Sequence, residues 1–208
     1  MKDFIYFSYN EFVDSATANK YGIDNRIPND AVKSNIFFLI TEVLDPLREL
    51  AGMPIYVTSG YRCKELNRLL KGSKNSQHMK GEAADISTLD KYGNMLLVIE
   101  LLCGHLMGEA DPVLKEIDLQ LAETEDFFDF DQLIMYRLTE DKTNFAWLHV
   151  SYKQNGENRR QVMMYHNGEY SILDIESEHR LLRDLAEQVT LHDNTLKEIY
   201  KPSKLNLQ

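Results

Sequence analysis

The stretch Ser59–Ile86 reads SGYRCKELNRLLKGSKNSQHMKGEAADI and decides how the chain is interpreted. A strand-forming run ends in a polar turn that carries Arg62, and His78 and Asp85 follow around a segment of small residues. A second histidine, His149, arrives much later, inside the segment FAWLHVSY. Two imidazoles and one carboxylate suit a catalytic Zn²⁺, because three protein ligands leave the fourth tetrahedral position open for water. The residues therefore point first to a zinc hydrolase.

His149 also admits a simpler interpretation, as a hydrogen-bonded structural histidine. The two-residue period of a strand puts it on one face with Phe145 and Trp147. Burial beside such aromatic rings is costly unless the ring nitrogens have partners, which either a metal or ordinary hydrogen bonds can supply. The small residues Ala83 and Ala84 allow close backbone approach beside Asp85 and favour the metal site.

Composition limits the class of protein. A chain of 208 residues, 43% hydrophobic and 27% charged, suits one soluble domain with an appendage. Its 33 acidic and 23 basic residues give a net charge of −10, which argues against nucleic acid or anionic membrane as a partner. No apolar run is long enough for a membrane span, and the first residues show no signal peptide. We expect a monomer made in the cytoplasm that reaches any external target by another route.

Periodicity and capping residues predict an α+β fold, in which helices pack against a small antiparallel sheet. Helices are expected over 8–19, 30–50 with a kink or the start of a second piece at Pro46, 64–71, 94–107 and 176–200, with another capped by Asp111 and begun by Pro112. Strands are expected over 53–58, 130–136, 145–152 and 161–165, with a hairpin over 139–144 and a turn at Asn167-Gly168. The metal-site domain is expected to cover residues 1–173, and a helical C-terminal extension residues 174–208.

Several motifs together resemble the zinc D-alanyl-D-alanine carboxypeptidase family of peptidoglycan peptidases. That family shares a metal core with lysostaphin-type endopeptidases and the hedgehog signalling domain. The similar segments extend from about Phe4 to Tyr165 and are, in order, FSYNEF, VLDPLRE, SGYR, SQH, AADI, FDQLI and WLHVSY. The resemblance implies that Zn²⁺ is the cofactor and that its ligands are His78, Asp85 and His149. It also implies that the partners of the protein are peptidoglycan peptides.

The resemblance places Arg62 in the active site, in contact with substrate. A fixed guanidinium there can bind a peptide carboxylate or stabilise a developing oxyanion; the alternative is a surface arginine that braces its loop. Gln77, beside the first ligand, is expected to bind substrate by orienting a carbonyl, or to hold a water.

Amide hydrolysis also needs a general base. Many relatives carry a glutamate three residues before the last histidine, where this chain has Ala146, and others carry one within the segment that is Met135–Arg137 here. Asp131 is the closest acidic residue on a similar motif, and we predict that it is the catalytic base; its alternative is a structural carboxylate at the start of a strand. The reserves are Glu82, Glu140 and Asp141.

These implications favour a zinc peptidase that hydrolyses an amide bond in peptidoglycan stem peptides, as a DD-carboxypeptidase or endopeptidase. The missing signal peptide favours a phage or prophage lysin, or a hydrolase of the virion tail. The alternative is a protein that keeps the fold and the zinc but has lost turnover, and serves as a cell-wall-binding or virion structural module. The absent glutamate and the charged helical tail favour that alternative.

Overall fold

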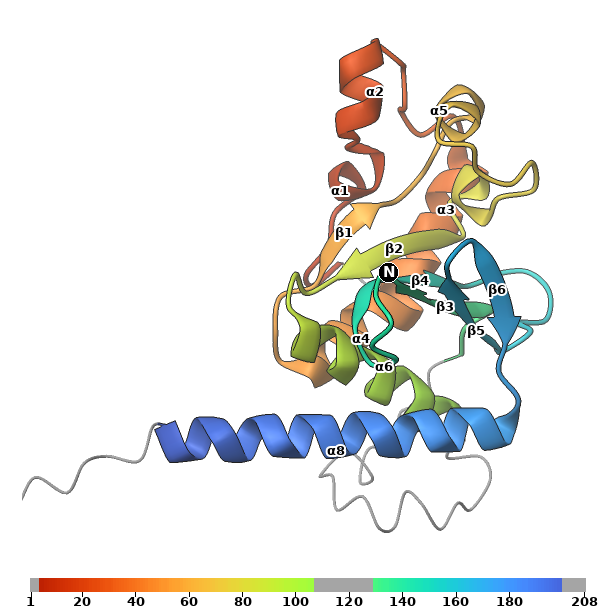
Figure 1. The fold of residues 1–208 in the computed structure, drawn as a ribbon. Helices are drawn as coiled ribbons and strands as arrows, with labels where there is room; N and C mark the ends of the chain where they lie inside the picture. Colours follow the sequence, from red (N-terminus) through yellow and green to blue (C-terminus); the bar gives the residue numbers. More distant parts are fainter. Residues whose placement is uncertain (1–3, 107–128, 200–208) are drawn as a thin grey trace, which may run out of the picture.

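The computed structural model describes residues 4–106 and 129–199, which form a six-stranded sheet with helices packed against it (Figure 1). The strand order is β1-β2-β4-β3-β5-β6, and every neighbouring pair is antiparallel except β3 and β5. The strands are β1 (Tyr56–Ser59), β2 (Ala83–Ser87), β3 (Gln132–Arg137), β4 (Phe145–Ser151), β5 (Gln161–His166) and β6 (Glu169–Ile172). The predicted α+β class is confirmed.

The helices surround this sheet, with most of the N-terminal ones drawn above it and α8 below it in Figure 1. They are α1 (Tyr9–Val13), α2 (Ala16–Tyr21), α3 (Asp30–Leu39), α4 (Asp45–Ala51), α5 (Lys64–Leu69), α6 (Lys91–Leu106) and α8 (Ile175–Ile199). The helix predicted to start at Asp111 and Pro112 lies outside the described residues. In residues 4–106 and 129–199, no helix combines the length and apolar character that crossing a bilayer requires.

The apolar stretch that covers α3 and α4 is interrupted near Pro46, as predicted. Proline has no N–H to donate to the carbonyl four residues back. The chain widens into a π-helical turn over Ile40–Leu44, in which the N–H of Asp45 donates to the carbonyl of Ile40. Pro46 then lies in the first turn of α4. The two helical pieces keep one buried face, made of Ile36, Leu39, Ile40, Val43, Leu44 and Leu47.

The strand register positions the candidate ligands. Strands β3 and β4 form the predicted antiparallel pair, in which Ile134 lies opposite His149. Strand β2 pairs with the other edge of β4 and puts Asp85 opposite the same histidine. The centre of the sheet therefore carries two of the three candidate ligands on adjacent strands.

The C-terminal helix α8 packs on α6 and closes the lower side of the core. Four of its apolar residues, Leu181, Leu182, Leu185 and Val189, are buried in the same hydrophobic cluster as residues of the sheet. The division between residues 173 and 174 stays a prediction.

Glu100 on α6 should make stability depend on pH. It is only 6% exposed, and burial raises the pKa of its carboxyl from 4.5 to about 7. Between these two pH values the folded state keeps a proton on Glu100 that the unfolded state has lost. The stability that this proton contributes is fully present below pH 4.5 and is lost as the pH rises through about 7. We expect Glu100→Gln to raise the free energy of unfolding by about 3 kcal/mol at pH 8 and to change it little at pH 4.5. Urea unfolding at both pH values measures this, and equal effects at both would contradict it.

Candidate metal centre

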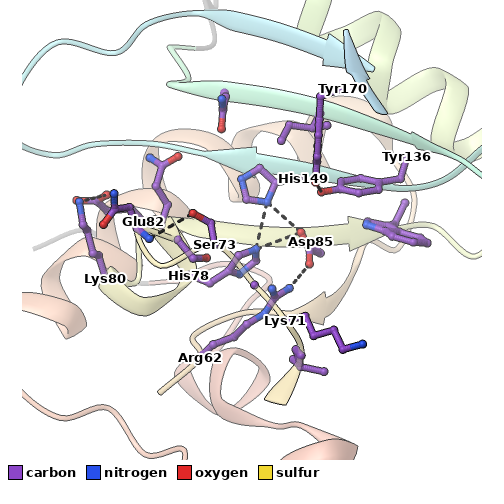
Figure 2. Close-up of a pocket in the computed structure, with 18 of the residues that line it drawn as sticks. Arg62, Lys71, Ser73, His78, Lys80, Glu82, Asp85, Tyr136, His149 and Tyr170 are labelled. Atoms are coloured by element: carbon purple, nitrogen blue, oxygen red, sulfur yellow. Dashed lines mark hydrogen bonds and ion pairs between the residues drawn. The ribbon is translucent and has the colours of Figure 1, made fainter. Parts of the chain in front are cut away.

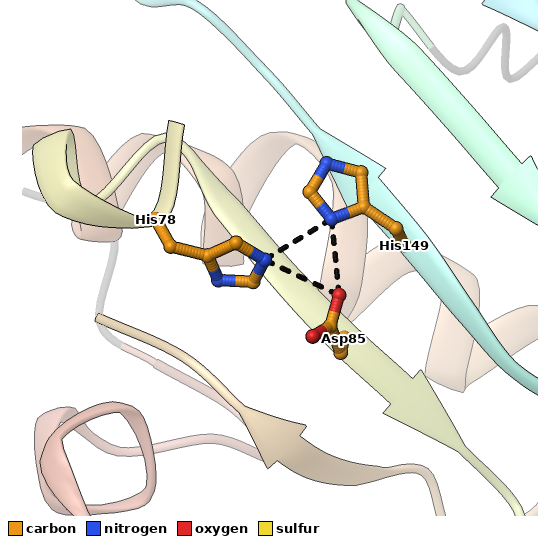
Figure 3. A group of neighbouring side chains, drawn as sticks. All are labelled: His78, Asp85 and His149. Atoms are coloured by element: carbon orange, nitrogen blue, oxygen red, sulfur yellow. Dashed lines mark hydrogen bonds and ion pairs between the residues drawn. The ribbon is translucent and has the colours of Figure 1, made fainter. Parts of the chain in front are cut away.

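Three separate elements bring His78, Asp85 and His149 together (Figures 2 and 3). His78 lies on a 3-10 turn over Gln77–Lys80, Asp85 on β2 and His149 on β4. The Nε2 atom of His78 lies 3.1 Å from Nδ1 of His149 and 3.2 Å from Oδ1 of Asp85, and the last two atoms are 3.0 Å apart. The predicted ligands thus form one compact triangle of donor atoms.

The dimensions of this triangle fit a zinc ion. Zinc binds imidazole nitrogen and carboxylate oxygen at about 2.0–2.2 Å, so neighbouring ligand atoms of a tetrahedral shell lie about 3.3–3.5 Å apart. The three measured separations of 3.0–3.2 Å are only slightly shorter. One ion can therefore bind all three side chains after a small outward movement of each.

A hydrogen bond on the outer nitrogen of His78 points its inner nitrogen at the other two candidate ligands. Its Nδ1 atom lies 2.7 Å from the carbonyl oxygen of Gly60, which can only accept, so Nδ1 carries the proton. In the neutral ring Nε2 is then a bare acceptor, yet it faces the carboxylate oxygen of Asp85. Two facing acceptors need a proton or a cation between them, and a carbonyl that orients the far nitrogen is typical of a metal-binding histidine.

The carbonyl that orients His78 depends on a glycine. A Cβ atom at Gly60 would lie 2.5 Å from Cα and 2.6 Å from the carbonyl oxygen of Phe12. Backbone atoms cannot move aside easily, so a side chain at this position would push the carbonyl of Gly60 away from the imidazole. The glycine of the SGYR motif therefore supports the first ligand indirectly.

Burial and mutual contact set the protonation of the site. Burial raises the pKa of Asp85, but the facing imidazoles of His78 and His149 outweigh it and hold that pKa well below its usual range. Burial also lowers the pKa of His149 below its ordinary value, although Asp85 opposes this. Asp85 is therefore ionised and His149 neutral near pH 7, and these are the forms that bind a metal.

Arg62 braces the carboxylate of Asp85 from the side opposite the histidines. Its Nη2 atom forms an ion pair with Oδ2 of Asp85, and its Nε donates to Oγ of Ser59 at 2.9 Å. Asp85 thus offers one oxygen to the histidines and the other to Arg62. The arginine side chain, 15% exposed, also lines the pocket beside the triangle. The structure therefore places Arg62 beside the candidate ligands, and its contact with substrate stays a prediction.

The triangle lies in the wall of a pocket of about 710 Å³ (Figure 2). Aromatic residues form another part of this wall: Tyr136 stacks on Trp147, with ring centroids 4.7 Å apart, and the hydroxyls of Tyr136 and Tyr170 lie 3.1 Å apart. No function was predicted for these rings from the sequence. The strand period carried a signal for one of them, because Tyr136 is two residues from Ile134, the partner of His149.

The structure places Gln77 in the pocket wall but Asp131 behind it. Gln77 lines the pocket, and its Nε2 donates to Oδ2 of Asp131 at 3.0 Å. Asp131 is fully buried and forms ion pairs with Lys153 and Arg159. Burial raises the pKa of Asp131, but these cations outweigh it and hold that pKa well below its usual range. Asp131 is therefore not brought together with the three ligands, and its predicted part as the base stays a prediction.

The reserve carboxylates differ in position. Glu82 lines the pocket, and its Oε2 atom is buried without a hydrogen-bond partner among the described residues. The same oxygen lies 3.9 Å from Nζ of Lys80. Glu140 pairs with His166 and Asp141 with Lys91, both outside the pocket lining. Glu82 is therefore the reserve that the structure places at the site.

A model of the peptidase M15 family matches residues 5–100. The match includes Arg62, His78 and Asp85, whereas His149 lies beyond it and joins the other ligands only through the sheet. No curated protein sequence matches the chain.

The resemblance inferred from the motifs is thus confirmed. Peptidases of this family are zinc-dependent hydrolases, and the triangle of His78, Asp85 and His149 can hold the metal. The predicted zinc cofactor is confirmed by these two findings together. The match to this family also supports the prediction that the protein is a metallopeptidase.

Proposed function

We propose that the protein is a zinc-dependent peptidase that hydrolyses an amide bond in the stem peptides of bacterial peptidoglycan, as a DD-carboxypeptidase or an endopeptidase. The observation that carries this proposal is the buried triangle of His78, Asp85 and His149 in the wall of an open pocket, beside Arg62. The match to peptidase M15 supports it. A role of the protein as a phage or prophage lysin stays a prediction.

The side chains around the pocket suit amide hydrolysis. A zinc ion held by the three ligands would polarise the scissile carbonyl and lower the pKa of water toward about 7. Arg62, held by Asp85 and Ser59, presents a fixed cation to a carboxylate or to negative charge on the carbonyl oxygen. Tyr136 keeps its proton, because burial and the hydroxyl of Tyr170 raise its pKa, so it can donate a hydrogen bond to substrate.

The proton acceptor is the residue to be assigned by experiment. Glu82 lines the pocket and keeps one carboxylate oxygen without a hydrogen bond in the described structure, so it should be tested beside Asp131. Glutamate is a common general base in hydrolases of this chemistry. Separate Glu82→Gln and Asp131→Asn variants, compared for turnover and zinc content, distinguish the two.

Purified sacculi test the proposed function. We expect the zinc-loaded protein to release new peptide termini from sacculi, and a chelator to stop this release by removing the ion. Added zinc should restore the activity of the chelated protein. Chromatography and mass spectrometry of the soluble products identify the bond that is cut. Release that is absent, or that continues unchanged in chelator, would contradict the proposal.

A catalytically weak cell-wall-binding or virion structural module is the second candidate. The small number of carboxylates in the pocket favours this candidate. Among the described residues, only Glu82 and the ligand Asp85 line the pocket with a carboxylate. Such a module would sediment with sacculi while releasing no peptide. Binding without turnover, in protein with full zinc content, would therefore support the second candidate over the first.

A further inference from the structure

Positive charge gathers around the metal pocket of an otherwise acidic protein. The chain has a net charge of −10. The described pocket lining nevertheless contains five cationic side chains and two carboxylates, Glu82 and Asp85. The cations are Arg62, Lys71, Lys80, Lys153 and Arg159. A cleft lined with one sign of charge attracts ligands of the opposite sign, so this pocket favours an anionic group.

Two of these cations are held by one buried carboxylate. Oδ1 of Asp131 accepts from Nζ of Lys153 at 2.6 Å and from Nε of Arg159 at 3.0 Å. Oδ2 accepts from Nη2 of the same arginine and from Gln77. Asp131 supplies one negative charge against the two positive charges of Lys153 and Arg159, so the three side chains together keep a net charge of +1. The cluster can therefore still attract a second carboxylate.

The two cations also keep surface toward the pocket. The side chain of Arg159 is 48% exposed and that of Lys153 is 27% exposed, while Asp131 is 0% exposed. A ligand can thus reach the cations but not the carboxylate behind them. Guanidinium and ammonium groups in such positions bind carboxylates by charge-assisted hydrogen bonds.

The next residue, Arg160, shows that this arrangement is specific to Arg159. Arg160 has a left-handed backbone, with φ of 51°, and its side chain turns to Asp129, with Nε 3.2 Å from Oδ1. It does not line the pocket. The two adjacent arginines therefore serve different surfaces, and Arg160 provides a matched control.

We propose that Lys153 and Arg159 form a carboxylate-binding subsite of the metal pocket, with Asp131 and Gln77 as positioning residues behind it. The subsite selects peptides with a free carboxylate close to the scissile bond. This assignment rests on the proposed peptidase function for its substrate class. The carboxylate comes either from the C-terminus of the peptide or from an acidic side chain, and both present the same group to the two cations.

Binding of a stem peptide tests the subsite independently of hydrolysis. The probes are one peptide with a free C-terminal and a free side-chain carboxylate, and two forms in which one or the other is amidated. Affinity comes from titration calorimetry for probes that mass spectrometry finds intact, and KM is used for those that are cleaved. We expect one amidation to weaken binding to the wild-type protein about tenfold or more, the scale of one charge-assisted hydrogen bond. The form that loses affinity identifies the source of the carboxylate.

Variants of the basic residues test which side chains cause the preference for a free carboxylate. Arg159→Gln and Lys153→Met should weaken binding of the preferred acid about tenfold and leave its amidated form unchanged. Arg160→Gln should bind all probes as the wild type does. The subsite is overturned if both amidated forms bind as well as the acid, if none of the probes binds, or if Arg159→Gln weakens acid and amide equally. Absence of hydrolysis with these preferences intact would refute the peptidase function alone.

Asp131→Asn separates positioning from proton transfer. A positioning residue should affect affinity for the acid probe, with KM raised and the preference for the carboxylate reduced. A proton acceptor should instead lower kcat by about 10²-fold with KM and the preference unchanged. We expect the first pattern, with zinc content retained. The second pattern would remove Asp131 from the subsite and confirm the role predicted from the sequence.

Discussion

Replacement of His149 by alanine is expected to abolish both stoichiometric zinc binding and hydrolysis. Residues that merely orient a metal ligand change metal affinity by about 10–100-fold when mutated, so loss of a ligand itself should exceed that range. His149 is 8% exposed and lies between β2 and β3. Its place on a central strand means that no neighbouring side chain can easily replace its imidazole. Only His78 and Asp85 would remain, an incomplete shell for zinc.

Stability should fall with the metal, because the free energy of zinc binding to the folded site contributes to folding. Metal analysis of the dialysed variant and its thermal unfolding with and without chelator measure both effects. His166→Ala is a matched control, since His166 lies on β5 outside the triangle and pairs with an exposed glutamate. It should keep its zinc. Undiminished zinc in His149→Ala would show that a different residue completes the site.

The ligand triangle could be predicted from the sequence because each ligand lies on a motif with its own local pattern. The period of two on FAWLHVSY placed His149 on the face of a strand, and small residues before Asp85 allowed two strands to approach. What the sequence could not give is the register, which sets Asp85 opposite His149. Register depends on pairing between segments that are distant in the chain.

Two parts of the sheet were missed for the same reason. Strand β6 follows the predicted Asn167-Gly168 turn, whose positive φ values of 51° and 89° suit a tight hairpin. Its sequence EYSI alternates between polar and apolar residues, but four exposed residues are too short a run to give a clear local signal. The parallel pairing of β5 with β3 likewise has no local signal. The contact between Tyr136 and Tyr170 depends on both and could not be foreseen.

Asp131 shows the limit of prediction from strand periodicity. The pattern around FDQLI placed its carboxylate near the start of a strand beside β4, which is where it lies. The cations that surround it come from the segment after β4, and a loop conformation brings Lys153 and Arg159 back to it. The chemistry of a carboxylate depends on these partners as much as on its strand.

Arg62→Lys is expected to keep the fold and the zinc but to lower turnover by about 10²-fold or more, the scale measured for loss of one donor to a developing oxyanion. The guanidinium holds Ser59 through Nε and Asp85 through Nη2 at the same time. Lysine keeps the positive charge but has a single nitrogen, which cannot reproduce this planar fork. The loss should therefore exceed what the charge alone explains.

Steady-state kinetics with a stem peptide, together with metal analysis, test the expected effect of Arg62→Lys. Arg26→Lys is the matched control, because Arg26 also pairs with an aspartate but has a side chain that is 86% exposed and lies outside the metal pocket. That variant should retain wild-type kinetics, since an exposed ion pair contributes little. If Arg62→Lys also turned over at a near wild-type rate with full zinc, Arg62 would serve only to brace Asp85. The cation that meets the substrate would then have to be sought among the other basic residues of the pocket.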